Sequence, residues 1–170
     1  METGDGASGS SSNKRPEEDE ITEKNRKPEE DEIIEENWKP EEEEIIEKNK
    51  NLSVLVVDDD PVVRRVHDML LQSIGIKAHV VENGKEAVDL FCIGLSYDLI
   101  LMDKDMPVMN GIEATKEIRG MGIHSMIVGV TESDVDSEKR EFATAGVDYC
   151  FQKPLTPERI NFILNDLNNF

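Results

Sequence analysis

From Leu52 onward, short apolar runs alternate with segments whose apolar residues recur at helical spacing. Strands are predicted at 52–57, 77–81, 98–102, 126–130 and 148–151, and helices at 61–74, 84–93, 111–119, 134–145 and 157–168. The first helix puts Val63, Val66, Leu70 and Ile74 on one apolar face, which is expected to pack inward. This alternation is typical of a parallel sheet wrapped by helices. Five such units in about 119 residues favour an open, doubly wound α/β sheet over a closed eightfold barrel, which needs about 250 residues.

Polar residues gather where the predicted strands end. In open α/β sheets the ligand site lies beyond the carboxyl ends of the strands. Four of these ends carry candidate site residues: Asp58, Asp59 and Asp60; Asp103 and Asp105; Thr131 and Glu132; and Lys153. Converging carboxylates repel one another unless a divalent cation lies between them, and Mg²⁺ fits because its preferred ligands are hard oxygens. The set predicts phosphoryl transfer onto an aspartate, which can act as a nucleophile toward phosphorus.

Each of these residues also has a plainer interpretation. Asp60 stands before Pro61 as a helix N-cap would, and the three adjacent aspartates could all be turn residues. Thr131 alone could be a cap, and Lys153 alone a solvated charge. The bond from Lys153 to the following proline could be trans or cis. Their shared position at strand ends is what favours a site.

The first part of the chain is a repeat. From residue 16, one unit recurs three times at a 12-residue period: PEEDEITEKNRK, PEEDEIIEENWK and PEEEEIIEKNKN. Each copy could form a short helix, since Pro suits the first turn and the glutamates after it favour the positive helix end. Yet about eight residues with only two adjacent apolar side chains rarely hold a helix alone, so disorder or a fluctuating helix is expected. We therefore predict a disordered acidic low-complexity extension at 1–51, followed by a single domain at 52–170. The alternative is an acidic docking tail anchored by Trp38 and the isoleucine pairs.

Composition excludes several classes of function. The formal net charge is −19, with −10 before residue 52 and −9 after it, so no basic footprint for nucleic acid exists. No apolar stretch is long enough for a membrane span, and no secretory or transit signal is present, so an intracellular location, cytoplasmic or also nuclear, is expected. Cys92 and Cys150 are too few for a disulfide framework and are expected to be buried apolar residues.

The motifs VVDDDP, LILMDKDMPVMNG, VGVT and CFQKP, in this order, resemble the receiver domain of two-component response regulators. The resemblance extends over about residues 52–168. It implies a flavodoxin-like (CheY-like) fold with five helices and strand order 2-1-3-4-5. It also implies a protein that catalyses its own phosphoryl transfer and dephosphorylation, and is not a metabolic enzyme.

The resemblance assigns roles to the residues at the strand ends. Asp103 would take a phosphoryl group from a phosphohistidine, and Asp59 would bind Mg²⁺ directly. Asp58 would assist through water, and the main-chain carbonyl of Asp105 would complete the protein ligands. Two residues, Thr131 and Lys153, would contact the phosphoryl oxygens, and Met106, Pro107 and Gly111 would shape the loop after the acceptor.

Within this family, MDKDMP, SMIVGVT and a cysteine three places before Lys153 are similar to the short plant regulators called type C. The expected phosphoryl donor is a histidine-containing phosphotransfer protein, in relays linked to cytokinin, or a histidine kinase. We expect a monomer without a DNA-binding output domain. Val62 and Met69, on the outward side of the first helix, are either docking residues for that donor or partly buried helix residues.

Two features depart from the family pattern. Many receivers carry an aromatic residue at the position of Cys150, whereas Tyr149 lies one place earlier and therefore on the opposite face of its strand. Glu132 stands where small residues are common, and with the Asp105 side chain it would add negative charge at the mouth of the site.

Other classes of protein share fragments of this pattern. An aspartyl phosphatase of the haloacid dehalogenase type also has the DxD of Asp103 to Asp105, but Pro107 stands where that family has Thr or Val. A flavin binder would share the fold, but three aspartates after the first strand would repel a flavin phosphate. A receiver-like interaction module that takes no phosphate is the remaining alternative.

Overall fold

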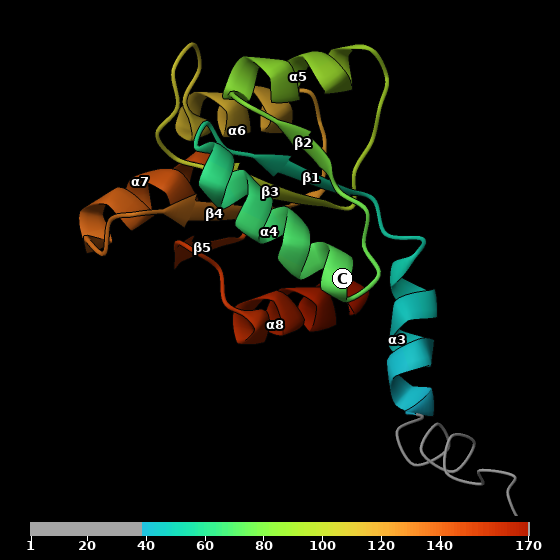
Figure 1. Ribbon diagram of the computed structural model, residues 1–170. Coiled ribbons are helices and arrows are strands. Elements are labelled where there is room, and N and C mark those ends of the chain that lie inside the picture. Colours follow the sequence, from blue (N-terminus) through green and yellow to red (C-terminus); the bar gives the residue numbers. More distant parts are fainter. Residues whose placement is uncertain (1–38, 170) are drawn as a thin grey trace, which may run out of the picture. The chain divides into compact units, whose positions relative to one another are not determined.

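The computed structural model describes residues 39–169, and five parallel strands form its sheet. The strands are β1 (Val54–Val57), β2 (His79–Val81), β3 (Leu99–Asp103), β4 (Met126–Thr131) and β5 (Tyr149–Gln152). They lie in the order β2-β1-β3-β4-β5, as Figure 1 shows. The predicted doubly wound sheet and its strand order are confirmed, and all four strand pairs are parallel.

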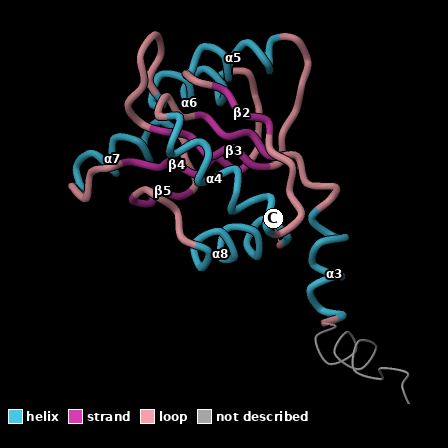
Figure 2. Tube along the Cα trace, viewed as in Figure 1, coloured by secondary structure: helices cyan, strands magenta, loops and turns pink. Residues whose placement is uncertain are grey.

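The described residues hold six helices, one more than the five expected. They are α3 (Pro40–Asn49), α4 (Pro61–Ser73), α5 (Gly84–Cys92), α6 (Gly111–Gly120), α7 (Asp136–Ala145) and α8 (Pro157–Asn168). Helices α4 and α8 cover one face of the sheet, and α5, α6 and α7 cover the other (Figure 2). Because both faces are covered, the strands can be apolar throughout.

The core has two layers because successive strand residues point to opposite faces. In β1, Val54 and Val56 pack with the α4 and α8 layer, while Leu55 and Val57 pack with the α5 to α7 layer. All residues of β1, β3 and β4 are buried. The central strands are thereby fixed, and the residues that follow them are held at one edge.

Helices α4 and α8 begin where the sequence predicts. The Asp60 carboxylate accepts a hydrogen bond from the Val62 N–H at 2.9 Å, which makes Asp60 the N-cap of α4. Thr156 caps α8 in the same way, through a 3.2 Å bond from the Arg159 N–H. A proline follows each cap, at a position where the missing N–H costs nothing.

Helix α3 is the element that the sequence did not predict, and it is the third copy of the repeat. Asn49 is buried, and its side-chain amide donates to the carbonyl of Ile74 at 2.8 Å, just past the end of α4. Ile46 lies against Gly75, where an added Cβ would be 2.9 Å from Ile46 Cγ2. For this copy, an ordered helix replaces the expected disorder. The first two copies and Trp38 lie outside the described residues, and the boundary at residue 51 stays a prediction.

Two predictions of burial were wrong. Val66 was expected on the inward face of α4 but is exposed, because the buried residues of that helix are His67 and Leu71. Cys92 is exposed and Cys150 is half-buried, whereas both were expected to be buried.

The peptide bond between Lys153 and Pro154 is cis, one of the two forms that the sequence left open. Among the residues that the structure describes, no helix combines the length and apolarity needed to cross a membrane.

Candidate functional site

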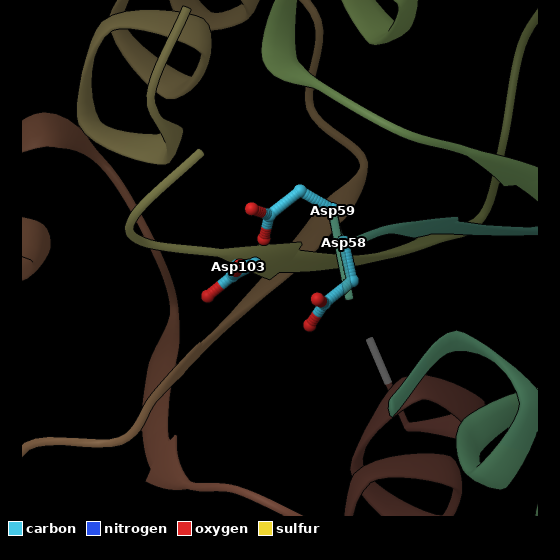
Figure 3. Close-up of side chains that lie close together, drawn as sticks. All are labelled: Asp58, Asp59 and Asp103. Carbon is cyan, nitrogen blue, oxygen red and sulfur yellow. The ribbon is translucent and has the colours of Figure 1, made fainter. Parts of the chain in front are cut away.

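The carboxyl ends of β1 and β3 bring three aspartates together. Val57 pairs with Met102, so the residues that follow, Asp58 and Asp103, lie side by side at the edge of the sheet. Asp58, Asp59 and Asp103 each offer a carboxylate oxygen, and these oxygens lie within 4.8 Å of one another (Figure 3). The predicted convergence of aspartates from two strands is therefore present in the fold.

Lys153 supplies the positive charge of this cluster. Its ammonium lies 3.0 Å from Asp103 Oδ1 and 3.3 Å from Asp58 Oδ2, and its side chain is 7% exposed. The Lys153 N–H donates to the carbonyl of Thr131 at 2.9 Å, which ties the end of β5 to the end of β4. Three carboxylates and one ammonium leave two formal negative charges at the site.

Asp103 is the most perturbed carboxyl group of the cluster. Burial raises its pKa to about 7; the hydrogen bond from Lys153 opposes this rise, and the charge of Asp58 adds to it. Burial also raises the pKa of Asp58. Asp103 Oδ2 is buried and has no hydrogen-bond partner within the described residues. A buried oxygen without a donor is costly, so this atom is the natural position for a ligand.

The residues present fit a magnesium ion. The candidate ligands are hard oxygens, the net charge of −2 matches one divalent cation, and Asp103 Oδ2 has no hydrogen-bond partner in the described part of the chain. A hollow of about 240 Å³ adjoins it, lined by Asp59, Asp60, Asp103, Asp105, Glu132 and Lys153. The exposed Asp105 and Glu132 add acidic groups at its mouth, as the sequence predicts.

Thr131 stands apart from this cluster. It ends β4 and is buried, and its Oγ1 accepts a hydrogen bond from the Ser133 N–H at 3.1 Å. It is not among the residues that line the hollow. The structure therefore brings together Asp58, Asp59, Asp103 and Lys153, and it places the buried Thr131 at the end of the neighbouring strand β4.

Sequence reasoning missed two residues that support the site from α4. The Arg64 guanidinium donates to the main-chain carbonyl of Asp58 at 2.8 Å. His67 is fully buried, and its Nε2 accepts a hydrogen bond from the Leu155 N–H at 3.1 Å. The signal was their helical spacing: Arg64, His67 and Leu71 lie at i, i+3 and i+7, on one face of the helix.

Two buried groups titrate in opposite senses. Asp103 has its folded-state pKa raised, so its contribution to stability is present below pH 3.8 and is lost as the pH rises through about 7. Burial, with the charge of Lys153 adding to it, lowers the pKa of His67 to about 4. Its contribution is lost as the pH falls from 6.5 to 4, because the unfolded chain takes up the proton first.

The two effects therefore offset each other, and removing one should reveal the other. In Asp103→Asn, we expect the free energy of unfolding to fall by about 3 kcal/mol between pH 6.5 and pH 4, at about 1.4 kcal/mol per pKa unit. Urea unfolding at a series of pH values measures this. The double variant Asp103→Asn/His67→Gln is the control that removes the slope of His67. Equal slopes in the single and double variants would contradict the assignment.

The strand order, with three aspartates and a lysine at the carboxyl edge of the sheet, is the arrangement that the resemblance to a receiver domain implies. Family comparison agrees: the response regulator receiver domain matches residues 54–165, and the chain belongs to that family. Two-component response regulator 24 of Arabidopsis thaliana is 55% identical over 117 residues, which cover 69% of this chain and 84% of that protein. It is one of the plant type-C regulators, so the resemblance to that subgroup is confirmed.

Solved structures agree with this assignment. The receiver domain of the histidine kinase CKI1 from Arabidopsis thaliana, complexed with Mg²⁺ and BeF₃⁻, is 31% identical with a TM-score of 0.66. The match covers 75% of this chain and 96% of that one. A second match is the co-crystal structure of the histidine phosphotransfer protein Ypd1 and the receiver domain of Ssk1, from Saccharomyces cerevisiae. The identity is 26% and the TM-score is 0.63, and the match covers 68% of this chain and 88% of that one.

Proposed function

We propose that this protein is a response regulator of a His-to-Asp phosphorelay that accepts a phosphoryl group on Asp103. The observation that carries the proposal is the buried Oδ2 of Asp103, which has no hydrogen-bond partner in the described part of the chain, while Lys153 lies 3.0 Å from Oδ1 and Asp103 is one of the residues that line the hollow. One carboxylate oxygen is thus paired with the lysine, and the other has no partner to displace before it reacts.

The transfer needs Asp103 in its ionised form. Its Oδ2 attacks the phosphorus of a phosphohistidine, the new O–P bond forms as the P–N bond breaks, and the electron pair returns to the imidazole of the donor. Lys153 stays within hydrogen-bond distance of Oδ1 and orients the carboxylate. The product is an acyl phosphate whose later hydrolysis restores Asp103.

Mg²⁺ would be held by Asp58, Asp59, Asp103 and the main-chain carbonyl of Asp105. When bound, it supplies positive charge that offsets the charge spread over the transferred group. The Mg²⁺ and BeF₃⁻ in the CKI1 receiver domain support this assignment. The Thr131 hydroxyl and the Lys153 ammonium would contact the phosphoryl oxygens from either side.

The donor we propose is a histidine-containing phosphotransfer protein of a cytokinin-type plant relay. The similarity to the Arabidopsis regulator supports the plant context, and the Ypd1 complex supports the kind of donor. The location that we propose is intracellular, in the cytoplasm and also in the nucleus. The haloacid dehalogenase alternative loses support because the chain belongs to the receiver family.

The test is to mix the protein with a phosphorylated phosphotransfer protein, with and without Mg²⁺. Rapid transfer of one phosphoryl group per chain, abolished by a chelator, is expected. The product should be labile to hydroxylamine, as an acyl phosphate is. A chain that binds the donor but takes no phosphoryl group would favour the alternative, a receiver-like interaction module.

A groove on α4 is the proposed docking surface for the donor. Its apolar members Val62 and Met69 are 68% and 56% exposed, next to the acidic edge of the sheet. The groove is lined by Pro61, Val62, Arg64, Arg65, Val66, Asp68, Met69 and Val80. An exposed apolar strip with a charged rim is typical of a protein interface.

We expect the double variant Val62→Asp/Met69→Asp to lower the rate of transfer from the phosphotransfer protein by about tenfold or more. Uptake from a small phosphoryl donor should be unchanged, because that donor needs no docking surface. Ile93→Asp is the matched control, since Ile93 is 75% exposed at the end of α5. Equal losses with both donors would show that the substitutions damage the site itself.

A further inference from the structure

The segment from β5 to α8 carries Lys153 and is anchored at several points. At its start, the Lys153 N–H donates to the Thr131 carbonyl at 2.9 Å. Pro154 has no N–H to donate. The next N–H, that of Leu155, is buried and donates to Nε2 of His67 at 3.1 Å. A side chain of α4 therefore fixes the backbone two residues after the lysine.

A histidine at this position is costly for a core. His67 is fully buried, and because its Nε2 accepts a hydrogen bond, the ring proton must lie on Nδ1. That nitrogen is buried and has no partner among the residues described. A leucine would fill the same space without a buried orphan donor. What the histidine adds is an acceptor for the Leu155 N–H.

The same helix reaches the site and the solvent. One turn before His67, Arg64 donates to the carbonyl of Asp58 and also lines the groove together with the exposed Val62 and Met69. Burial lowers the pKa of His67 to about 4, so the ring is neutral near pH 7 and can accept. Helix α4 is thus bonded to the chain just after two of the three strands that carry the site, β1 and β5.

We infer that His67 is a positioning residue for Lys153: by accepting from the Leu155 N–H, it sets where the lysine ammonium lies relative to Asp103. This inference rests on the proposed function, since it concerns the lysine that would contact the phosphoryl group. It also makes α4, which carries the proposed docking surface, a mechanical link to the acceptor site.

Two substitutions of His67 distinguish the role of Nε2 as a hydrogen-bond acceptor from the role of the ring in filling space. His67→Gln offers an amide oxygen near the place of Nε2, whereas His67→Leu fills the space without an acceptor. We expect His67→Leu to weaken beryllofluoride binding in saturating Mg²⁺ by about tenfold, the scale of one charge-assisted hydrogen bond. Mg²⁺ affinity should stay within about twofold, since the lysine is not a metal ligand. His67→Gln should recover most of the loss.

A double-mutant cycle decides whether His67 acts through Lys153. In a Lys153→Ala background, His67→Leu should have no further effect on beryllofluoride affinity, because the group it positions is gone. Additive losses, or wild-type affinity in His67→Leu, would overturn the inference. If the wild type itself binds no beryllofluoride with Mg²⁺, the proposed function fails instead. Ring ¹⁵N shifts of His67 give an independent check, since a protonated Nε2 would also overturn it.

Discussion

Phosphoryl uptake from the phosphotransfer protein is expected to fall to background in Asp103→Asn. The asparagine amide has nearly the same shape but is not a nucleophile toward phosphorus, so no acyl phosphate can form. Uptake per chain after rapid mixing, with radiolabelled donor, is the measurement.

The control for this variant is Asp105→Asn, which changes an exposed carboxylate two residues along the same loop. It keeps the Asp103 carboxylate and the Asp105 main-chain carbonyl, so uptake should stay within about threefold. Urea unfolding of both proteins checks that neither loss arises from a damaged fold. Uptake that persists in Asp103→Asn would mean that another side chain is the acceptor.

A large loss of stability is expected from Gly111→Ala, a substitution at the first residue of α6. A Cβ at this position would lie 2.0 Å from the main-chain oxygen of Asp103 and 3.1 Å from Lys104 Cα, so it would collide with backbone. The Gly111 N–H also donates to the Lys104 carbonyl at 2.8 Å. Because α6 cannot move away without breaking this bond, we expect a loss of at least about 3 kcal/mol in the free energy of unfolding.

The same helix offers a matched control. At Gly120, the last residue of α6, the Cβ position has no atom within 4 Å among the described residues beyond its chain neighbours and its own helix backbone. Gly120→Ala should be neutral or stabilise by up to about 1 kcal/mol, since alanine restricts the unfolded chain. Urea unfolding compares the two variants. If Gly111→Ala were as stable as Gly120→Ala, the close approach of α6 to the acceptor strand would be wrong.

The position of the site could be predicted because it depends on chain order. Asp58, Asp103 and Lys153 each follow a strand, and parallel strands bring their carboxyl ends to one edge. The predicted strands and helices agree with the structure to within about two residues, since Gly, Pro and cap residues mark most ends. The partnering of Lys153 with two aspartates could not be read from spacing, because it depends on side-chain reach.

The predictions that were wrong or incomplete concern packing between elements that lie far apart in the chain. Helix α4 has apolar residues on two sides, so its pattern alone selected Val66 for burial, whereas α8 covers the side of His67 and Leu71. The spacing of His67 places it on the face of Arg64 and Leu71, but its partner could not be read from the sequence, because Leu155 lies 88 residues away. The order of helix α3 was missed for the same reason. Its acidic sequence is fixed by the hydrogen bond from the Asn49 side chain to the carbonyl of Ile74, the residue just after α4.

Helix α3 changes where the protein can be shortened. A version that begins at residue 52, as the repeat pattern suggests, would remove the Asn49 amide from the Ile74 carbonyl and uncover Gly75. A version that begins at Lys39 would retain both contacts. Biophysical comparisons of trimmed proteins should therefore start before Pro40, so that a frayed end of α4 is not mistaken for a property of the phosphoryl site.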